Sequence, residues 1–170
     1  MGLTGSGAQL MSSKKFSVLF VCMGNICRSP VLMAELQRQA KEKKLEDQLL
    51  VDSCALTAWH VGENTDPRMQ KAALSRGLKV QHKAKLFQKE YFKTFDFIFV
   101  VDRDVLHLLM QAAKETKPTA KIALATAFCD AYKDQDIQDP YYDKETAFDR
   151  TVLMAEGCCR GILDMLFTKE

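Results

Sequence analysis

Short apolar runs alternate along the chain with longer segments in which apolar and polar residues follow a helical period. Four of the apolar runs predict buried strands, at residues 16–21, 49–53, 95–101 and 121–124. The segments between and after them predict helices at residues 30–44, 66–77, 103–114 and about 147–167. Strands separated by helices require crossover connections, which make the strands parallel and cover both faces of the sheet. We therefore expect a single-domain α/β fold with a short parallel sheet of about four strands.

Residues that favour helix ends mark several of these boundaries. Ser29 is a favoured N-cap, and Pro30 is favoured at the first helical position. The pair Asp66-Pro67 opens the second helix in a similar way. In open parallel sheets, ligands bind beyond the carboxyl ends of the strands. The loop that joins the first strand to the first helix, residues 22–30, is therefore the first candidate for a site.

Length and charge limit the classes of function. The 170 residues suit one domain, and 47% hydrophobic content is enough for one core. A net charge of +2 gives no broad electrostatic field, so we expect neither nucleic-acid binding nor stable membrane association. We interpret residues 1–14 as a flexible leader before a domain over residues 15–170. The leader fits a loose myristoylation pattern at Gly2 and Ser6. So short a pattern arises easily by chance, so we give it no weight.

The cysteines and histidines argue against a disulfide framework and against a metal centre. The sequence contains no Cys-x-x-Cys pair, and the histidines do not follow metal-ligand spacings. In a chain of this length without a secretion signal, we expect free thiols, no cofactor and a cytoplasmic location. The residues concerned are Cys22, Cys27, Cys54, Cys129, Cys158, Cys159, His60, His82 and His107.

The loop from Cys22 to Pro30 reads Cys-Met-Gly-Asn-Ile-Cys-Arg-Ser-Pro. A loop in this place can point backbone N–H groups at an anion, and the helix N-terminus adds partial positive charge. Gly24 lets the backbone approach closely, and Arg28 offers a planar fork of donors that matches two phosphate oxygens. The same surroundings favour a thiolate at Cys22, towards which Ser29 can donate a hydrogen bond. On the pattern alone, Cys22 could also end a buried strand as a small hydrophobe.

A second segment offers the proton that the leaving oxygen of a phosphate ester needs. Asp139 precedes a proline, which favours an extended conformation in a turn or loop, and its carboxyl group can serve as a general acid. Tyr141 and Tyr142 follow and offer aromatic surface beside a flat substrate ring. Taken alone, the Asp-Pro pair is also a common turn signal, and the tyrosines are equally compatible with a core position.

Residues 18–30 resemble the signature of the low-molecular-weight protein tyrosine phosphatases. The resemblance extends from Lys15 to the end of the chain, because further motifs of that family occur in the same order. It implies an enzyme that hydrolyses phosphotyrosine in proteins, or small aryl phosphates, through a phosphocysteine intermediate and without a cofactor. The further motifs are Val51-Asp52-Ser53, Trp59-His60-Val61-Gly62, His82-Lys83-Ala84, Phe95-Asp96, Asp102 and Asp139-Pro140-Tyr141-Tyr142.

The resemblance also implies roles for individual residues. Cys22 would be the nucleophile, Arg28 would hold the phosphate, and Asp139 would be the general acid. A disulfide between Cys22 and Cys27 would protect the nucleophile from deeper oxidation. The phosphate-binding loop would comprise Met23, Gly24, Asn25, Ile26, Cys27 and Arg28. The residues supporting it would be Asn25, Ser29, Ser53, His82 and Asp102, the last by orienting Arg28. The substrate cleft would be lined by Met23, Trp59, His60, Tyr141 and Tyr142.

Simpler interpretations of some of these residues remain open from the sequence. His82 is compatible with an ordinary surface histidine, Trp59 with a partly buried core residue, and Cys27 with a spectator thiol. Ser53 could merely start a turn, and Asp102 could cap a helix while also orienting Arg28. The residues 31–33 depart from the family, which usually has one small residue before Ala-Glu. We expect this departure to affect the packing of the first helix and not the chemistry.

Three rival functions make different demands on the sequence. A protein arginine phosphatase of the same fold would carry Thr in place of Ile26 and would lack the paired tyrosines. A thiol-coupled arsenate reductase would need two further cysteines after His82, and residues 83–128 contain none. A phosphotyrosine-binding module without turnover would be expected to lose the nucleophile, the arginine or the acid, and all three are present. The sequence therefore favours a phosphotyrosine phosphatase.

Overall fold

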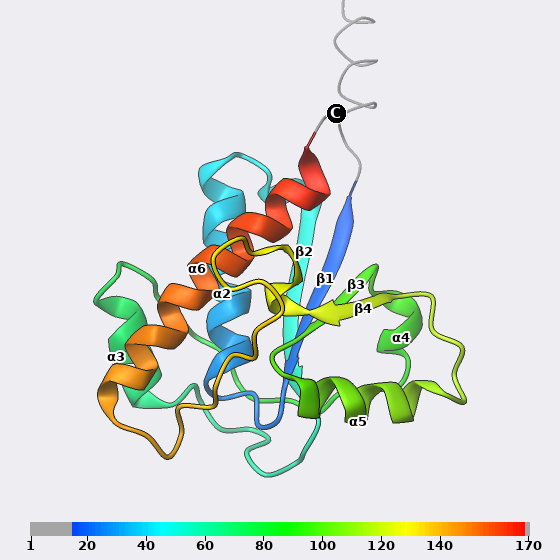
Figure 1. Cartoon of the computed structure of the whole chain (residues 1–170), viewed down its shortest axis with the longest axis horizontal. Coiled ribbons are helices and arrows are strands. Elements are labelled where there is room, and N and C mark those ends of the chain that lie inside the picture. The colour runs from blue at the N-terminus through cyan, green and yellow to red at the C-terminus, as the bar shows by residue number, and fades with distance from the viewer. Residues whose placement is uncertain (1–14, 169–170) are drawn as a thin grey trace, which may run out of the picture.

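The expected α/β fold is present in the computed structural model, which describes residues 15–168. Its four strands are β1 (Phe16–Cys22), β2 (Leu49–Ala55), β3 (Phe97–Val100) and β4 (Lys121–Leu124). All neighbouring strands are parallel, in the order β2-β1-β3-β4 (Figure 1). The leader expected over residues 1–14, with its Gly2 pattern, lies outside the described residues.

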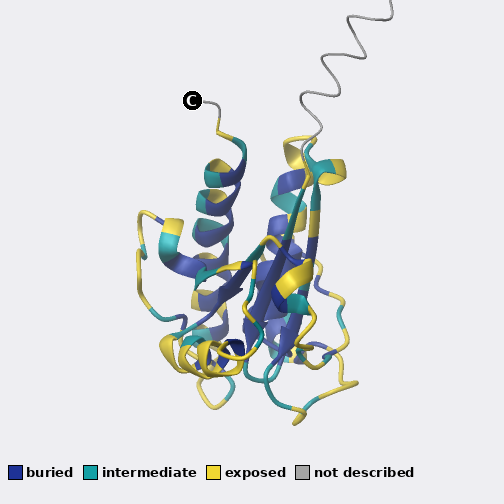
Figure 2. Ribbon diagram, turned by 90° about the vertical axis from the view of Figure 1, so that its right-hand side faces the viewer, coloured by how far each residue is buried: buried dark blue, intermediate teal, exposed yellow. Residues whose placement is uncertain are grey.

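Helices cover both faces of this sheet. Four consecutive residues of β1, Val18 to Val21, have no exposed surface, although successive side chains of a strand point to opposite faces. Helix α2 packs on β1 and β2, α6 packs on α2 and α3, and α5 packs on β3 and β4. Figure 2 shows buried residues along the sheet and on the inward sides of the helices. The helices are α2 (Arg28–Glu42), α3 (Pro67–Leu74), α4 (Tyr91–Thr94), α5 (Arg103–Ala113) and α6 (Glu145–Phe167), with short 3-10 turns η1 (Glu46–Gln48) and η2 (Ala125–Phe128).

The start of α2 differs from the expectation for the first helix. The helix begins at Arg28, with Cys27 at the N-cap position and no side-chain hydrogen bond to the cap. The prediction that Ser29 caps the helix is therefore wrong, because its hydroxyl is used elsewhere, and Pro30 is the third helical residue. The unusual residues 31–33 fit the core, since Val31 and Leu32 have at most 1% exposed surface.

Other boundaries follow the sequence more closely. Asp66 is the N-cap of α3, and its carboxylate accepts the N–H of Arg68 at 2.8 Å. Helix α6 begins two residues earlier than expected. Strand β3 is shorter than the predicted 95–101, because Phe95 ends the unpredicted helix α4 and Asp96 bonds the backbone of Ser17.

The topology directs several loops to one edge of the sheet. The chain leaves β1 for β2 on one side and returns to β3 on the other side of β1. The carboxyl end of β1 is therefore the point at which the strand order reverses, where open α/β sheets bind ligands. Cys22 is the last residue of β1. None of the helices within residues 15–168 is long and apolar enough to cross a bilayer.

Candidate active site

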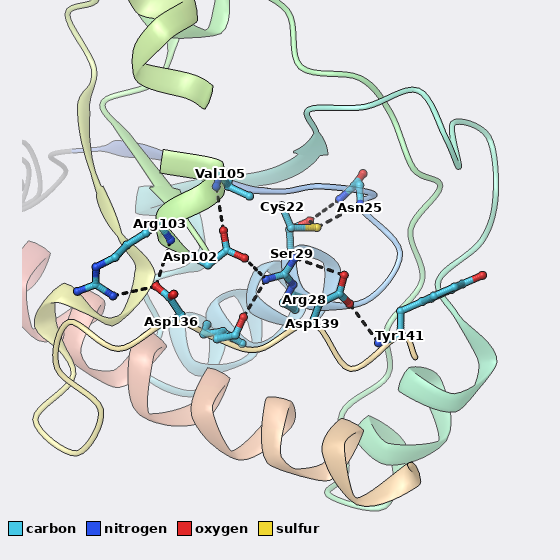
Figure 3. A network of polar contacts seen from close by, with 11 residues as sticks. Cys22, Asn25, Arg28, Ser29, Asp102, Arg103, Val105, Asp136, Asp139 and Tyr141 are labelled. Atoms are coloured by element: carbon cyan, nitrogen blue, oxygen red, sulfur yellow. Dashed lines mark hydrogen bonds and ion pairs between the residues drawn. The ribbon is translucent and has the colours of Figure 1, made fainter. Parts of the chain in front are cut away.

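The sulfur of Cys22 has two hydrogen-bond partners at the floor of a pocket. Cys22 is 3% exposed, and the backbone N–H of Asn25 donates to its Sγ at 3.1 Å. The Ser29 hydroxyl lies 2.9 Å from the same sulfur (Figure 3). Asn25 has a φ of 61°, a left-handed conformation that asparagine tolerates better than most residues. This turn aims the Asn25 N–H back at the sulfur.

The direction of the hydrogen bond between Ser29 and Cys22 follows from the contacts of Asn25. The backbone N–H of Lys85 can only donate, and it lies 3.1 Å from Asn25 Oδ1. This contact fixes the orientation of the Asn25 amide, so that its Nδ2 donates to Ser29 at 2.7 Å and to Ser53 at 3.0 Å. Because the Ser29 oxygen accepts from Asn25, its own proton is available for the sulfur of Cys22. The network can therefore direct two hydrogen-bond donors at this sulfur.

His82 completes this network from the side of Asn25. Its Nε2 lies 3.0 Å from Asn25 Oδ1 and 3.2 Å from the Ser53 hydroxyl. Burial lowers the pKa of His82 below its ordinary value, which favours a neutral ring. A proton on Nε2 matches the carbonyl oxygen of Asn25. His82 is therefore half-buried in the network rather than an ordinary surface histidine.

Arg28 enters the same pocket from the first turn of α2. Its Nη1 donates to Asp102 Oδ2 at 2.6 Å and to the carbonyl of Ile137 at 2.8 Å. Asp102 also accepts the N–H of Val105 at 2.8 Å, so it caps α5 and orients Arg28 at once. Burial opposes the charge of Arg28, but Cys22, Asp102 and Asp139 together raise its pKa above the usual value. The guanidinium is therefore a fixed positive charge beside the thiol.

The carboxylate of Asp139 reaches the pocket from the opposite loop. Its Oδ2 lies 3.6 Å from Arg28 Nη2, and its Oδ1 accepts the backbone N–H of Tyr141 at 3.1 Å. The Asp139 side chain is 48% exposed, so water can reach it. Figure 3 shows Arg28 between Asp102 and Asp139, beside Cys22. A thiol, a fixed cation and a carboxylate thus share one pocket.

Aromatic residues form the walls of this pocket. Trp59 is 72% exposed at the rim, so the interpretation as a partly buried core residue is wrong. The ring of His60 lies against the loop: a side-chain carbon added at Gly24 would come within 2.9 Å of it. His60 Nδ1 is also 3.0 Å from Glu63, and its ring is 5.6 Å from that of Tyr141. The lining residues are Cys22, Met23, Gly24, Asn25, Ile26, Cys27, Arg28, Trp59, His60, Asp139, Tyr141 and Tyr142.

Cys27 is the second thiol of the loop. It is 4% exposed, and burial raises its pKa well above the ordinary value, so it carries a proton at neutral pH. All six cysteines lie within the described residues, and all are free thiols. No group of three or more metal-ligating side chains occurs among residues 15–168.

Two residues that hold this site in place are not predicted by the sequence. One is Lys85, which acts through its backbone N–H and whose ammonium group pairs with Asp52. The other is Arg68, which stacks on Tyr141. Neither position carries a local signal, because both contacts join segments that only the fold brings together.

Comparisons with known proteins agree with this geometry. The family model described as low molecular weight phosphotyrosine protein phosphatase matches residues 17–170. The protein of that name from Sus scrofa is 37% identical over 149 residues, which cover 87% of this chain and 94% of the relative. A protein tyrosine phosphatase structure from Entamoeba histolytica superimposes with a TM-score of 0.85 at 33% identity, over 89% of this chain and 97% of that one. A Drosophila arginine phosphatase structure gives 0.82 at 33% identity, over 90% and 99%.

Proposed function

The chain belongs to the low molecular weight phosphotyrosine protein phosphatase family, and from that membership we propose that it hydrolyses phosphotyrosine through a phosphocysteine on Cys22. The observation that carries the proposal is the convergence of two donors, from Asn25 and Ser29, on one sulfur beside a buried arginine. A thiolate in that position is both stabilised and aimed at an anion.

The phosphate group would bind at the start of α2. No side chain caps the first turn of this helix, so its N–H groups can bind the oxygens of an anion. Arg28 can donate to two phosphate oxygens from the side, and Asp102 keeps its guanidinium in orientation. In phosphoryl transfer the negative charge spreads over the equatorial oxygens, so these donors would stabilise the transition state.

The first step transfers the phosphoryl group to sulfur. The Cys22 thiolate attacks phosphorus in line, the bond from phosphorus to the tyrosine oxygen breaks, and protonated Asp139 gives its proton to that oxygen. In the second step, the Asp139 carboxylate takes a proton from a water molecule whose oxygen attacks phosphorus. The sulfur–phosphorus bond breaks, which releases phosphate and restores the thiolate.

Phosphotyrosine is favoured over phosphoarginine as the substrate. The family model and the curated relatives are named for phosphotyrosine, and the arginine phosphatase alternative is not favoured by them. Ile26 stands where the arginine phosphatases carry Thr, and both Tyr141 and Tyr142 line the pocket. Two aromatic walls suit a flat ring. The expected substrates are therefore proteins that contain phosphotyrosine, and small aryl phosphates.

Two further expectations belong to this proposal. The first is that oxidation links Cys22 to Cys27 and that the disulfide protects the nucleophile. The second is a cytoplasmic location without nucleic-acid or stable membrane partners, which the six free thiols and the small net charge support. Fractionation of cells that express the tagged full chain tests the location.

The activity is tested with para-nitrophenyl phosphate and with matched peptides carrying phosphotyrosine or phosphoarginine. We expect turnover by the wild type with a chelator present, none by Cys22→Ser, and a preference for the phosphotyrosine peptide. Rapid acid quenching of the wild type should trap phosphate on the peptide that contains Cys22. A folded wild type that binds phosphate without turnover would instead indicate a binding module.

A further inference from the structure

The guanidinium of Arg68 contacts two aromatic rings, one in the loop before α6 and one in the first turn of α6. Its guanidinium carbon is 4.6 Å from the centre of the Phe148 ring in α6 and 5.2 Å from that of Tyr141. Tyr141 belongs to the loop that carries Asp139. Arg68 itself is the second residue of α3. The first turn of α3 therefore meets a distant part of the chain, the Asp139 loop and the start of α6 that follows it, at one guanidinium group.

The orientation of this guanidinium is fixed by Asp66. Arg68 donates from Nε to Asp66 Oδ1 at 3.1 Å and from Nη2 to Oδ2 at 2.8 Å. Asp66 is only 7% exposed, and its own N–H donates to the carbonyl of Ile26 at 2.9 Å. Ile26 belongs to the loop beneath Cys22. The planar fork is thus anchored to the phosphate-binding loop, which makes it a rigid platform for an aromatic ring.

The loop that carries Asp139 has few other anchors. Upstream, the N–H of Ile137 donates to Val101 at 2.9 Å. From there to the start of α6, most residues are exposed, and Pro140 is the one buried residue. The N–H of Tyr141 donates to Asp139 Oδ1, so the position of Tyr141 directly affects that of the carboxylate. A contact that fixes Tyr141 therefore also fixes Asp139.

We propose that Arg68 is a positioning residue for the general acid: it holds Tyr141, and through Tyr141 it keeps the carboxyl group of Asp139 over the nucleophile. The inference rests on the proposed function, because it requires Asp139 to protonate the leaving oxygen. Arg68 does not line the pocket, so it acts on the reaction through Tyr141 and Asp139.

The test compares Arg68→Met and Arg68→Lys with Arg76→Met as a matched control. Arg76 makes a similar two-point pair with Glu156, at 2.6 and 2.9 Å, and its side chain is 43% exposed against 40% for Arg68. It contacts no residue of the Asp139 loop in the hydrogen bonds and ion pairs of the described residues. Lysine keeps the charge of Arg68 but loses the planar fork, so Arg68→Lys separates stacking from charge.

The informative quantity is kcat/KM for aryl phosphates whose leaving groups increase in pKa. A dinitrophenolate leaves without a proton, whereas a phenolate resembling tyrosine needs one. We expect Arg68→Met to lose about tenfold or more on phenyl phosphate and less than about threefold on dinitrophenyl phosphate, because general-acid help is worth about 10²–10⁴-fold in total. Arg68→Lys should show most of this loss, and Arg76→Met should leave both rates within about twofold of wild type.

A second arm repeats the Arg68 substitutions in an Asp139→Asn background. With no acid left to position, each should change kcat/KM on phenyl phosphate by less than about twofold. An equal loss on all leaving groups, or a full additional loss beside Asp139→Asn, would overturn the role of Arg68 and leave the proposed function intact. If the loss of kcat/KM caused by Asp139→Asn is the same for all leaving groups, Asp139 is not the general acid, and the inference fails with that assignment.

Discussion

The Ser29 hydroxyl lies 2.9 Å from the sulfur of Cys22 and accepts a hydrogen bond from the amide of Asn25, so we assign its own proton to the sulfur. Cys22 and Ser29 are seven residues apart in sequence, because Cys22 ends β1 and Ser29 lies in the first turn of α2. The same serine would be a routine helix cap if α2 began two residues later, at Pro30. Ser29 has no exposed surface, and its hydroxyl bonds the sulfur of Cys22 and the amide of Asn25 instead.

Removing that hydroxyl should slow both steps of catalysis. In Ser29→Ala the thiolate loses one of its two donors, and a hydrogen bond to a charged group contributes about 1.5–3 kcal/mol. We therefore expect kcat/KM to fall about ten- to hundredfold, together with slower alkylation of Cys22 by iodoacetamide at neutral pH. Ser75→Ala is the control, since the Ser75 hydroxyl bonds the carbonyl of Ala72 at the end of α3. Unchanged alkylation in Ser29→Ala would contradict the assigned direction.

The left-handed backbone of Asn25 can be tested separately from its side chain. Asn25→Ala and Asn25→Gly both remove the amide that joins Ser29, Ser53 and His82, so both should lose activity to a similar extent. Only alanine is strained at a φ of 61°, so the glycine variant should be more stable by about 1 kcal/mol. Urea unfolding measures the difference. Equal stability of the two variants would argue that the loop relaxes.

A matched control for this strain exists on the surface. Lys44 has a φ of 60° just after α2, and no part of the pocket includes it. Lys44→Gly should therefore stabilise the fold by up to about 1 kcal/mol without a change in turnover. A loss of stability there would show that the lysine side chain contributes more than its strained backbone costs.

The sequence predicts the strands better than the helix ends, and the difference has a physical reason. Strand β1 is a continuous apolar run that any buried parallel strand requires. Helix α4 spans only four residues, too few for a helical period to appear. Helix α2 begins earlier than predicted because the Ser29 hydroxyl faces the sulfur of Cys22 and no side chain caps the first turn, so the usual N-cap signal does not apply.

The residues of the candidate site also differ in whether the sequence predicts them. Cys22 and Arg28 can be predicted from the sequence because the loop after β1 places them at a short fixed spacing, whereas Asp139 is indicated by the resemblance of its Asp-Pro-Tyr-Tyr segment to the family. The contributions of Lys85 and Arg68 were not visible, since one donates a backbone N–H and the other stacks on a ring from a distant loop. Contacts of that kind depend on tertiary structure, and a single sequence holds no local pattern for them.

Oxidation should affect Cys22 and Cys27 differently. Because burial keeps Cys27 protonated, peroxide should first convert the Cys22 thiolate to a sulfenic acid and release hydroxide, which takes up a proton from solvent to give water. The Cys27 sulfur then attacks that sulfur and displaces a second water, which leaves a disulfide. We expect dithiothreitol to restore most activity of the oxidised wild type and little of the Cys27→Ser variant, whose Cys22 oxidises further.

Mass spectrometry distinguishes these products. The wild type should contain a peptide pair joined through Cys22 and Cys27, and Cys27→Ser should contain sulfinic or sulfonic acid at Cys22. Cys129→Ala is the control, because Cys129 is equally buried beside Gly157 in α6. Full recovery of oxidised Cys27→Ser by dithiothreitol would show that Cys27 does not protect the nucleophile.

Trp59 should contribute to binding of a protein substrate more than to chemistry. It is 72% exposed at the rim of the pocket, so the free protein gains little from its ring, whereas a bound phosphotyrosine peptide can cover it. Burying about 60 Å² of apolar surface contributes about 1.5 kcal/mol, which corresponds to about a tenfold change in affinity. We expect Trp59→Ala to raise KM for a phosphotyrosine peptide about tenfold, with kcat and the free energy of unfolding nearly unchanged. Leu74→Ala provides the comparison, because Leu74 is 66% exposed on α3 and does not line the pocket. A fall in kcat with an unchanged KM would instead place Trp59 among the residues that act on the transition state.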